Sequence, residues 1–168
     1  MMLLLIRHGP AGDREAWRAL GKDDFLRPLT ADGRARTRSA ARGLARIIDR
    51  PQAIATSPFA RSIQTADHVA REFGVEAAEE LHAIVPAGAP ADVMPWLTAR
   101  ARLDLVALVG HEPQLGRLAS WLLARSERPI LTLKKGGACL LDLGPRPRAG
   151  ESRLVWMLAP AQLRRLGR

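Results

Sequence analysis

Hydrophobic and polar positions follow two alternating patterns along the first two thirds of the chain. Short, almost wholly apolar runs are typical of strands buried on both faces, and they occur at residues 3–6, 53–56 and 105–109. Apolar residues at helical spacing indicate amphipathic helices, and they occur at residues 30–48, 58–73 and 113–122. Because strands and helices alternate in this order, the sequence predicts parallel strands sandwiched between helices.

Capping residues define the expected ends of two of these helices. Thr30 is a typical N-cap for the first, and it should end near Asp49-Arg50-Pro51 because proline cannot continue a helix. Ser57 and Pro58 are expected to be the N-cap and the first residue of the second helix. Gly74 should close that helix.

The remaining segments are less regular. Residues 10–27 carry glycine and aspartate between scattered apolar positions, which indicates a loop or a partly helical excursion over the sheet edge. Residues 76–101 predict an extended segment, a loop and then a helix. Two strand-like segments, 138–143 and 153–158, flank a Gly- and Pro-rich loop and predict an antiparallel hairpin, followed by a short helix from Pro160.

No repeat or linker divides the chain, so the sequence predicts a single domain over residues 1–168. The expected fold class is α/β, a three-layer α/β/α sandwich. Its central sheet is expected to be mostly parallel, with the antiparallel hairpin at the C-terminal end.

Composition agrees with this fold class and restricts the function. The 168 residues are 47% hydrophobic and 26% charged, as in ordinary globular proteins. The formal net charge of +9 suggests an anionic partner, but the arginines are spread along helices and tyrosine is absent. Because a stacking surface for single strands is missing, we expect a solvated basic surface with an anion site and no nucleic-acid partner. The C-terminal run 163–168 is interpreted as a solvated helix end.

The cellular location is predicted from the cysteine content and from the N-terminal run. Cys139 is the one cysteine and lies in an apolar run, so it should fill the core, and its lack of a partner is typical of a reducing compartment. The first apolar run has no basic leader and is too short for a secretion signal or a membrane span. We therefore expect a cytoplasmic protein without a membrane partner.

Polar residues follow two of the predicted strands where each strand ends. Arg7, His8 and Gly9 follow the first strand, and His111 follows the strand at 105–109. The carboxyl ends of parallel strands meet at one edge of a sheet, and ligands of α/β proteins bind there. If these two strands are neighbours, the two histidines face each other across a pocket.

Arg61 is expected to join Arg7 in that pocket. It stands in the first turn of a predicted helix, where the helix N-terminus favours anions, and Thr65 follows on the same helix face. Two guanidiniums and two imidazoles make an oxyanion site. An imidazole with its ordinary pKa of about 6.5 is largely neutral at physiological pH, and the neutral ring is a nucleophile. His8 could therefore accept a phosphoryl group, which water then removes.

Several other polar residues have simpler interpretations. A histidine pair beside Glu112 could bind zinc, but the arginines would repel a cation, so we expect neither a metal nor another cofactor. His68 and His82 lack such neighbours and are interpreted as surface or packing residues. Lys134 and Lys135 precede two glycines and could hold an anion, although a basic turn leading into a strand is the simpler interpretation.

Four motifs occur in order over most of the chain: Arg7-His8-Gly9, Leu29-Thr30-x-x-Gly33, Thr56-Ser57-Pro58-x-x-Arg61-x-x-x-Thr65-Ala66 and Val109-Gly110-His111-Glu112-Pro113. Together they resemble the histidine phosphatase superfamily, and most closely its SixA-type branch of phosphohistidine phosphatases. The resemblance implies a phosphoglycerate mutase-like fold in which His8 accepts the phosphoryl group. It also implies that Arg7 and Arg61 bind phosphate and that His111 is the second histidine. Gly9 and Thr65 are expected in the same substrate-binding set.

One departure from the family pattern bears on the substrate. Many members carry a proton-donating carboxylate two residues after a leucine in the middle segment, but no acid stands there after Leu81. Glu80, Glu112 or Asp13 could replace it. The SixA-type resemblance implies phosphohistidine in a signalling or phosphotransfer protein as substrate and inorganic phosphate as product. The missing acid supports an N–P substrate, because imidazole is a far better leaving group than an alkoxide, which needs protonation. The alternatives are a phosphomonoesterase for a small metabolite and a non-catalytic phosphate-binding module.

Overall fold

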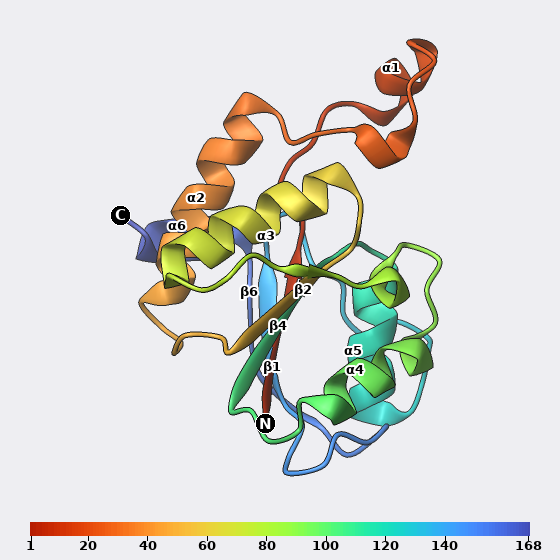
Figure 1. Cartoon of the computed structure of the whole chain (residues 1–168), viewed down its shortest axis with the longest axis vertical. Coiled ribbons are helices and arrows are strands. Elements are labelled where there is room, and N and C mark those ends of the chain that lie inside the picture. The colour runs from red at the N-terminus through yellow and green to blue at the C-terminus, as the bar shows by residue number, and fades with distance from the viewer.

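The computed structural model describes residues 1–168 and is built on one six-stranded sheet with the strand order β3-β2-β4-β1-β5-β6 (Figure 1). The strands are β1 (Met2–Arg7), β2 (Ala53–Thr56), β3 (Glu79–Glu80), β4 (Leu105–Gly110), β5 (Ala138–Asp142) and β6 (Arg153–Leu158). β1, β2, β3 and β4 are parallel, whereas β5 runs antiparallel to both β1 and β6. The predicted mixed sheet with an antiparallel C-terminal hairpin is confirmed.

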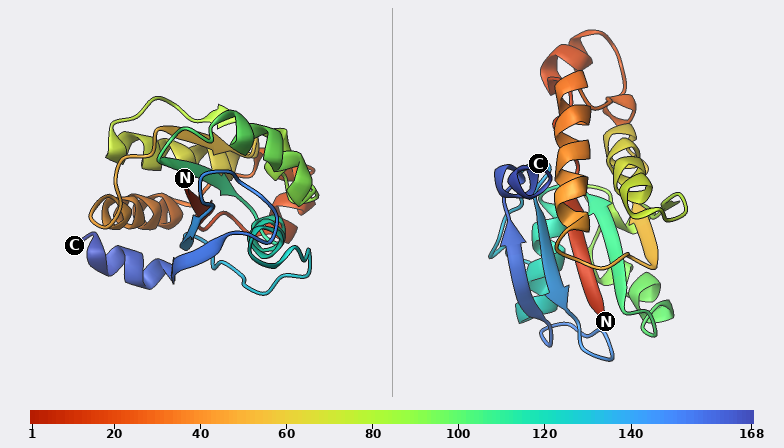
Figure 2. Two further views of the ribbon diagram at one scale, coloured as in Figure 1. Left: turned by 90° about the horizontal axis from the view of Figure 1, so that it is seen from below. Right: turned by 90° about the vertical axis from the view of Figure 1, so that its left-hand side faces the viewer.

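Helices cover both faces of this sheet, which confirms the three-layer arrangement (Figure 2). One face carries α2 (Ala31–Ala45), α3 (Ala60–Phe73) and α6 (Pro160–Leu166), and the other carries α4 (Met94–Ala99) and α5 (Gln114–Ala124). A sixth helix, α1 (Arg14–Ala19), lies outside these layers. No helix is long and apolar enough to cross a membrane.

The central strand β1 is apolar throughout because helices pack on both of its faces. Leu3 and Leu5 belong to the core beneath α4 and α5, whereas Leu4 and Ile6 belong to the core beneath α2, α3 and α6. All four side chains are at most 3% exposed. Alternate side chains of a strand point to opposite faces, so a run without polar positions requires two covering layers.

The register of β1 and β4 determines what lies at the sheet edge. Arg7 is opposite Gly110, and His8 N donates a hydrogen bond of 3.0 Å to Gly110 O. The residues that follow Arg7 and Gly110 therefore leave the sheet at the same height along the strands. In this way His8 and His111 reach the same edge from neighbouring parallel strands.

Residues 11–29 form the expected excursion, which projects beyond the sheet edge as the part of the molecule that carries α1 (Figure 1). Asp13 is the N-cap of α1 and accepts a hydrogen bond from Ala16 N, and a short 3₁₀ helix follows at Asp24–Leu26. Trp17 Nε1 donates to Asp23 O at 2.8 Å, which closes the excursion on itself. An isolated bridge between Ala11 and Leu29 joins its two ends.

Three details of the sequence prediction are wrong. The helix α2 ends at Ala45 rather than near residue 49, because the amides of Ile47 and Ile48 both turn back to the carbonyl of Leu44. The helix α3 begins at Ala60, so Ser57 does not cap it. The C-terminal run is not simply a solvated helix end, since Leu163 is fully buried where α6 packs against α2.

Candidate active site

His8 lies at the carboxyl end of β1 with its ring held in one orientation. Its Nδ1 lies 2.7 Å from Gly9 O, and because a carbonyl oxygen only accepts, Nδ1 carries the proton. Nε2 therefore keeps its lone pair in the neutral ring. The Gly9 amide in turn donates to Thr65 Oγ1 at 3.0 Å, and that hydroxyl donates to Arg61 O at 2.7 Å. A side chain at Gly9 would collide with Thr37, so the turn requires glycine.

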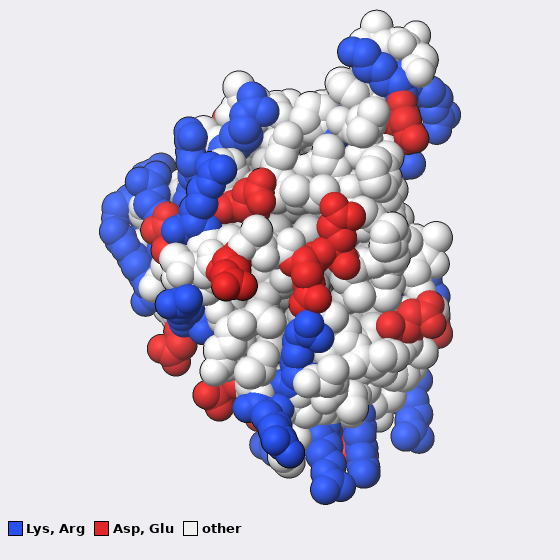
Figure 3. Space-filling model, viewed as in Figure 1, with Lys and Arg blue, Asp and Glu red and all other residues white.

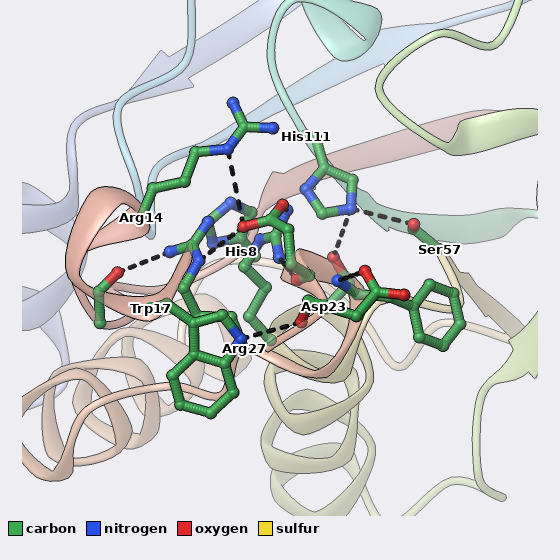
Figure 4. A network of polar contacts seen from close by, with 12 residues as sticks. His8, Arg14, Trp17, Asp23, Arg27, Ser57 and His111 are labelled. Carbon is green, nitrogen blue, oxygen red and sulfur yellow. Dashed lines mark hydrogen bonds and ion pairs between the residues drawn. The ribbon is translucent and has the colours of Figure 1, made fainter. Parts of the chain in front are cut away.

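The structure places His111 directly beside His8, with the ring centroids 5.0 Å apart. His111 Nε2 lies 2.9 Å from Ser57 Oγ and 3.1 Å from Ser62 Oγ, so two hydroxyls orient the ring (Figure 4). The edge of the Phe59 ring packs on the same imidazole at a centroid distance of 4.8 Å. Hydroxyls can donate or accept, so this arrangement suits either tautomer of a neutral His111.

Both histidines are held in the neutral form at pH 7. Burial lowers the pKa of His8 to about 3, although its hydrogen bond to Gly9 opposes the shift and the positive charges of Arg61, Arg7 and Lys135 add to it. Burial also lowers the pKa of His111 to about 2, with a further contribution from His8. The His8 ring is therefore available as a nucleophile over the whole physiological range.

Arg7 is anchored from behind by the loop that precedes β5. Its Nη1 donates to Leu133 O at 2.7 Å, and Leu133 N donates to Glu112 Oε1 at 2.7 Å. Glu112 Oε2 also accepts from Gly116 N at 3.2 Å, so both carboxylate oxygens hold backbone amides. The Nε of Arg7 is buried without a partner, which leaves a free donor on a guanidinium that lines the pocket.

Arg61 is anchored by the excursion. Its Nη1 donates to Asp24 O at 2.8 Å and its Nη2 to Asp24 Oδ2 at 3.1 Å. The guanidinium also stacks on Phe59, 4.6 Å from the ring centroid. Asp24 contacts two more cations, Arg27 at 2.7 Å and Arg14 at 3.6 Å. Like Arg7, Arg61 keeps a buried Nε without a partner.

These side chains surround an open cavity of about 520 Å³ at the sheet edge. Its lining is Arg7, His8, Ala11, Gly12, Asp13, Arg14, Arg27, Arg61, Pro86, His111, Glu112 and Lys135. Five cations against two carboxylates make the cavity strongly positive. Figure 4 shows Arg14 and Arg27 reaching it from the excursion, on the side opposite Ser57. Such a cavity attracts multiply charged anions.

The three candidate proton donors occupy different positions. Asp13 and Glu112 line the cavity, whereas Glu80 lies exposed in β3 and does not. Burial raises the pKa of Glu112, although its backbone hydrogen bonds oppose the shift. For Asp24, burial alone would raise the pKa, but the hydrogen bond from Arg27 and the surrounding arginine charges lower it. Asp24 therefore stays ionised.

The structure thus brings together Arg7, His8, Arg61 and His111, and places Gly9 and Thr65 directly behind His8. His68 and His82 do not line the cavity. The sequence interpretation missed the residues that orient or extend the site, namely Arg14, Asp24, Arg27, Ser57, Phe59 and Ser62. Ser57 already stands in the motif that begins at Thr56, but the sequence predicts it as a helix cap, and Ser62 directly follows Arg61.

Comparison with known proteins agrees with the resemblance to the histidine phosphatase superfamily. Residues 3–83 match the histidine phosphatase superfamily (branch 1). The chain is 34% identical over 147 residues to an uncharacterised protein of Picosynechococcus sp., a match that covers 86% of each chain. The chain belongs to the histidine phosphatase superfamily, and this membership together with its similarity to SixA supports phosphatase activity.

Within this superfamily the chain is of the SixA type. It is 26% identical over 167 residues to the phosphohistidine phosphatase SixA of Escherichia coli, covering 98% of this chain and 97% of that protein. The solved structure of a protein histidine phosphatase SixA bound to tungstate superposes with a TM-score of 0.80 at 26% identity. That match covers 97% of this chain and 99% of the other.

Proposed function

We propose that the chain hydrolyses phosphohistidine on a signalling or phosphotransfer protein through a covalent phosphohistidine intermediate on His8. The observation that carries the proposal is a neutral His8 whose Nδ1 proton is bound to Gly9 O, in a cavity lined by two anchored arginines. This arrangement leaves the Nε2 lone pair free to attack phosphorus. The superfamily and the SixA-type relationship support it.

The reaction would take place in two displacements. In the first, His8 Nε2 forms a bond to phosphorus while the N–P bond of the substrate breaks, and the departing imidazole takes up a proton. In the second, water forms an O–P bond and gives up a proton to solvent while the His8 Nε2–P bond breaks, so that inorganic phosphate leaves and the neutral His8 ring is restored. The guanidiniums of Arg7 and Arg61, which line the cavity, are suited to bind the equatorial oxygens in both steps.

The carboxylates near the cavity favour an N–P substrate over a phosphate ester. Asp24 is ionised and paired with arginines, Asp13 caps α1, and both oxygens of Glu112 hold backbone amides. Asp24 and Glu112 would have to give up these contacts to protonate a poor leaving group, whereas Asp13 keeps only Oδ2 for this purpose. Lack of a general acid commonly lowers ester hydrolysis about 10²–10⁴-fold, whereas the imidazole of phosphohistidine leaves far more easily.

The proposal is tested by comparing substrates with wild type and His8→Ala. A phosphorylated phosphotransfer protein is expected to lose its phosphate at a kcat/KM at least about 10²-fold above that of a sugar phosphate or a nucleotide. His8→Ala should abolish turnover. Faster hydrolysis of either ester would support a small-molecule phosphomonoesterase instead, and tight phosphate binding without turnover of any substrate would support a binding module.

A further inference from the structure

A second basic cavity lies beside the catalytic cavity and shares one residue with it. It measures about 260 Å³ and is lined by Pro10, Arg36, Thr37, Lys134, Lys135, Gly136, Ala159, Pro160, Ala161 and Arg164. Lys135 also lines the catalytic cavity. We call the smaller cavity the Lys134 pocket. Lys135 therefore links the cavity that holds His8 to the one lined by the start of α6.

The backbone of the turn that carries Lys134 and Lys135 is held against the end of β1. Gly136, whose φ is +78°, turns the backbone so that its amide contacts Arg7 O at 3.1 Å and His8 O at 3.0 Å. In the other direction, Arg7 N donates to Gly137 O at 3.0 Å. The lysine turn is therefore attached by backbone hydrogen bonds to the two residues that lead into the active site.

The charge of the Lys134 pocket is not neutralised within the protein. Its lining includes four basic side chains and no acidic one. Arg36 pairs with the exposed Asp32, but Lys134, Lys135 and Arg164 form no ion pair. Figure 3 shows that lysine and arginine side chains gather over the α2 and α6 side of the molecule. Bringing like charges into one hollow is unfavourable unless an anion binds there.

The position of the pocket indicates the kind of anion. A phosphohistidine side chain that enters the catalytic cavity leaves its own backbone outside, so its sequence neighbours must lie along the rim. The rim on the β5 side is the lysine turn. The ammonium groups of the two lysines, on flexible stems, and the guanidinium of Arg164 can each pair with a carboxylate that lies along this rim.

We propose that the Lys134 pocket binds an acidic side chain of the phosphoprotein substrate close to its phosphohistidine. This inference rests on the proposed function and adds a substrate preference to it. Lys135, between the two cavities, is shared by the phosphoryl group and the carboxylate. The pocket thereby selects phosphohistidines that have aspartate or glutamate nearby.

The test uses two synthetic phosphohistidine peptides that differ only in flanking residues, glutamate in one and glutamine in the other. Wild type is expected to show a KM about 3- to 10-fold lower for the glutamate peptide, with kcat unchanged, because solvent-exposed ion pairs strengthen binding only modestly. Raising the salt concentration should remove the difference. The variant Lys134→Ala with Arg164→Ala should show a clearly smaller preference between the peptides than wild type, because only Lys135 and the Asp32-paired Arg36 remain as cations of the pocket.

A matched control removes the same number of charges from the opposite edge of the sheet. Arg50 and Arg102 are exposed, form no ion pair and precede β2 and β4 at their amino ends. The double alanine variant of these two should keep the wild-type preference. Circular dichroism of both double variants checks that each is folded.

Each remaining outcome rejects a defined part of the account. Equal KM values for the two peptides in wild type, or an equal loss of preference in the control variant, would overturn the Lys134 pocket while the proposed function stands. A second small-molecule phosphate could bind in the Lys134 pocket in place of a carboxylate. If Lys134→Ala weakened turnover of a diphosphorylated small molecule while wild type showed no preference for the glutamate peptide, the carboxylate assignment would be overturned. Hydrolysis of neither peptide would overturn the proposed function and this inference with it.

Discussion

Replacement of Thr65 by valine tests how the active-site turn is held. Thr65 is 1% exposed, and its hydroxyl accepts a hydrogen bond from the amide of Gly9 at 3.0 Å and donates to Arg61 O at 2.7 Å. Valine keeps the shape but leaves the buried Gly9 amide without an acceptor, whereas the Arg61 carbonyl still accepts its helical hydrogen bond. A buried donor without a partner costs about 1–3 kcal/mol.

Thr37 offers a matched control. It is 4% exposed, and its hydroxyl donates to Gly33 O at 2.7 Å, the same bond to the preceding helical turn that Thr65 makes. No amide outside the helix depends on it, so Thr37→Val should lose less than about 1 kcal/mol.

The assay is urea unfolding of wild type and both variants at pH 7, together with thermal melts. Thr65→Val is expected to lose about 1–3 kcal/mol, which for a chain of this size lowers Tm by about 2–4 °C per kcal/mol. Its kcat should fall as well, because the Gly9 carbonyl orients His8. Equal losses in the two variants, or an unchanged Thr65→Val, would refute the role assigned to this hydroxyl.

Three further predictions concern the histidines and the packing of α6. Because the pKa values of His8 and His111 lie at about 3 and about 2, below their ordinary 6.5, both residues favour the folded state above pH 6.5, and this contribution is lost as the pH falls. Urea unfolding at pH 7 and 4.5 should therefore show a drop in stability that is smaller in His8→Asn; an equal drop would contradict it. Ser57→Ala and Ser62→Ala should each lower kcat/KM about tenfold or less and together by more, since one hydroxyl still pairs with the ring in each single variant; full activity in the double variant would contradict this. Gly43→Ala would place a methyl group 1.9 Å from a backbone oxygen of α6, and a thermal melt should show a loss of about 1–3 kcal/mol, so an unchanged melt would argue against this packing.

The sequence predicts most of the fold because the strong signals are local. The apolar run of β1 and the periodic stripe of α5 give both the type and the place of each element, and the strand-end positions of His8 and His111 follow from them. The predicted end of α2 was wrong because Ile48 packs against the core although the helix has already ended before it. Local propensity cannot detect such a tertiary contact.

The shape of the active site was less predictable than its principal residues. Ser57 before proline is a standard helix-start signal, yet here its hydroxyl contacts His111, a residue that follows a different strand, β4. Asp24 reaches Arg61 from an excursion whose path is set by contacts far apart in the sequence. In both cases a polar residue is used by a partner that only the folded chain brings close.

The central claim is that His8 accepts the phosphoryl group, and direct labelling tests it. After reaction with a labelled phosphoryl donor and rapid denaturation, wild type should carry an acid-labile, base-stable label that is absent from His8→Ala. His68→Ala, which alters a histidine outside the cavity, should label like wild type. Equal labelling of His8→Ala and wild type would contradict the account.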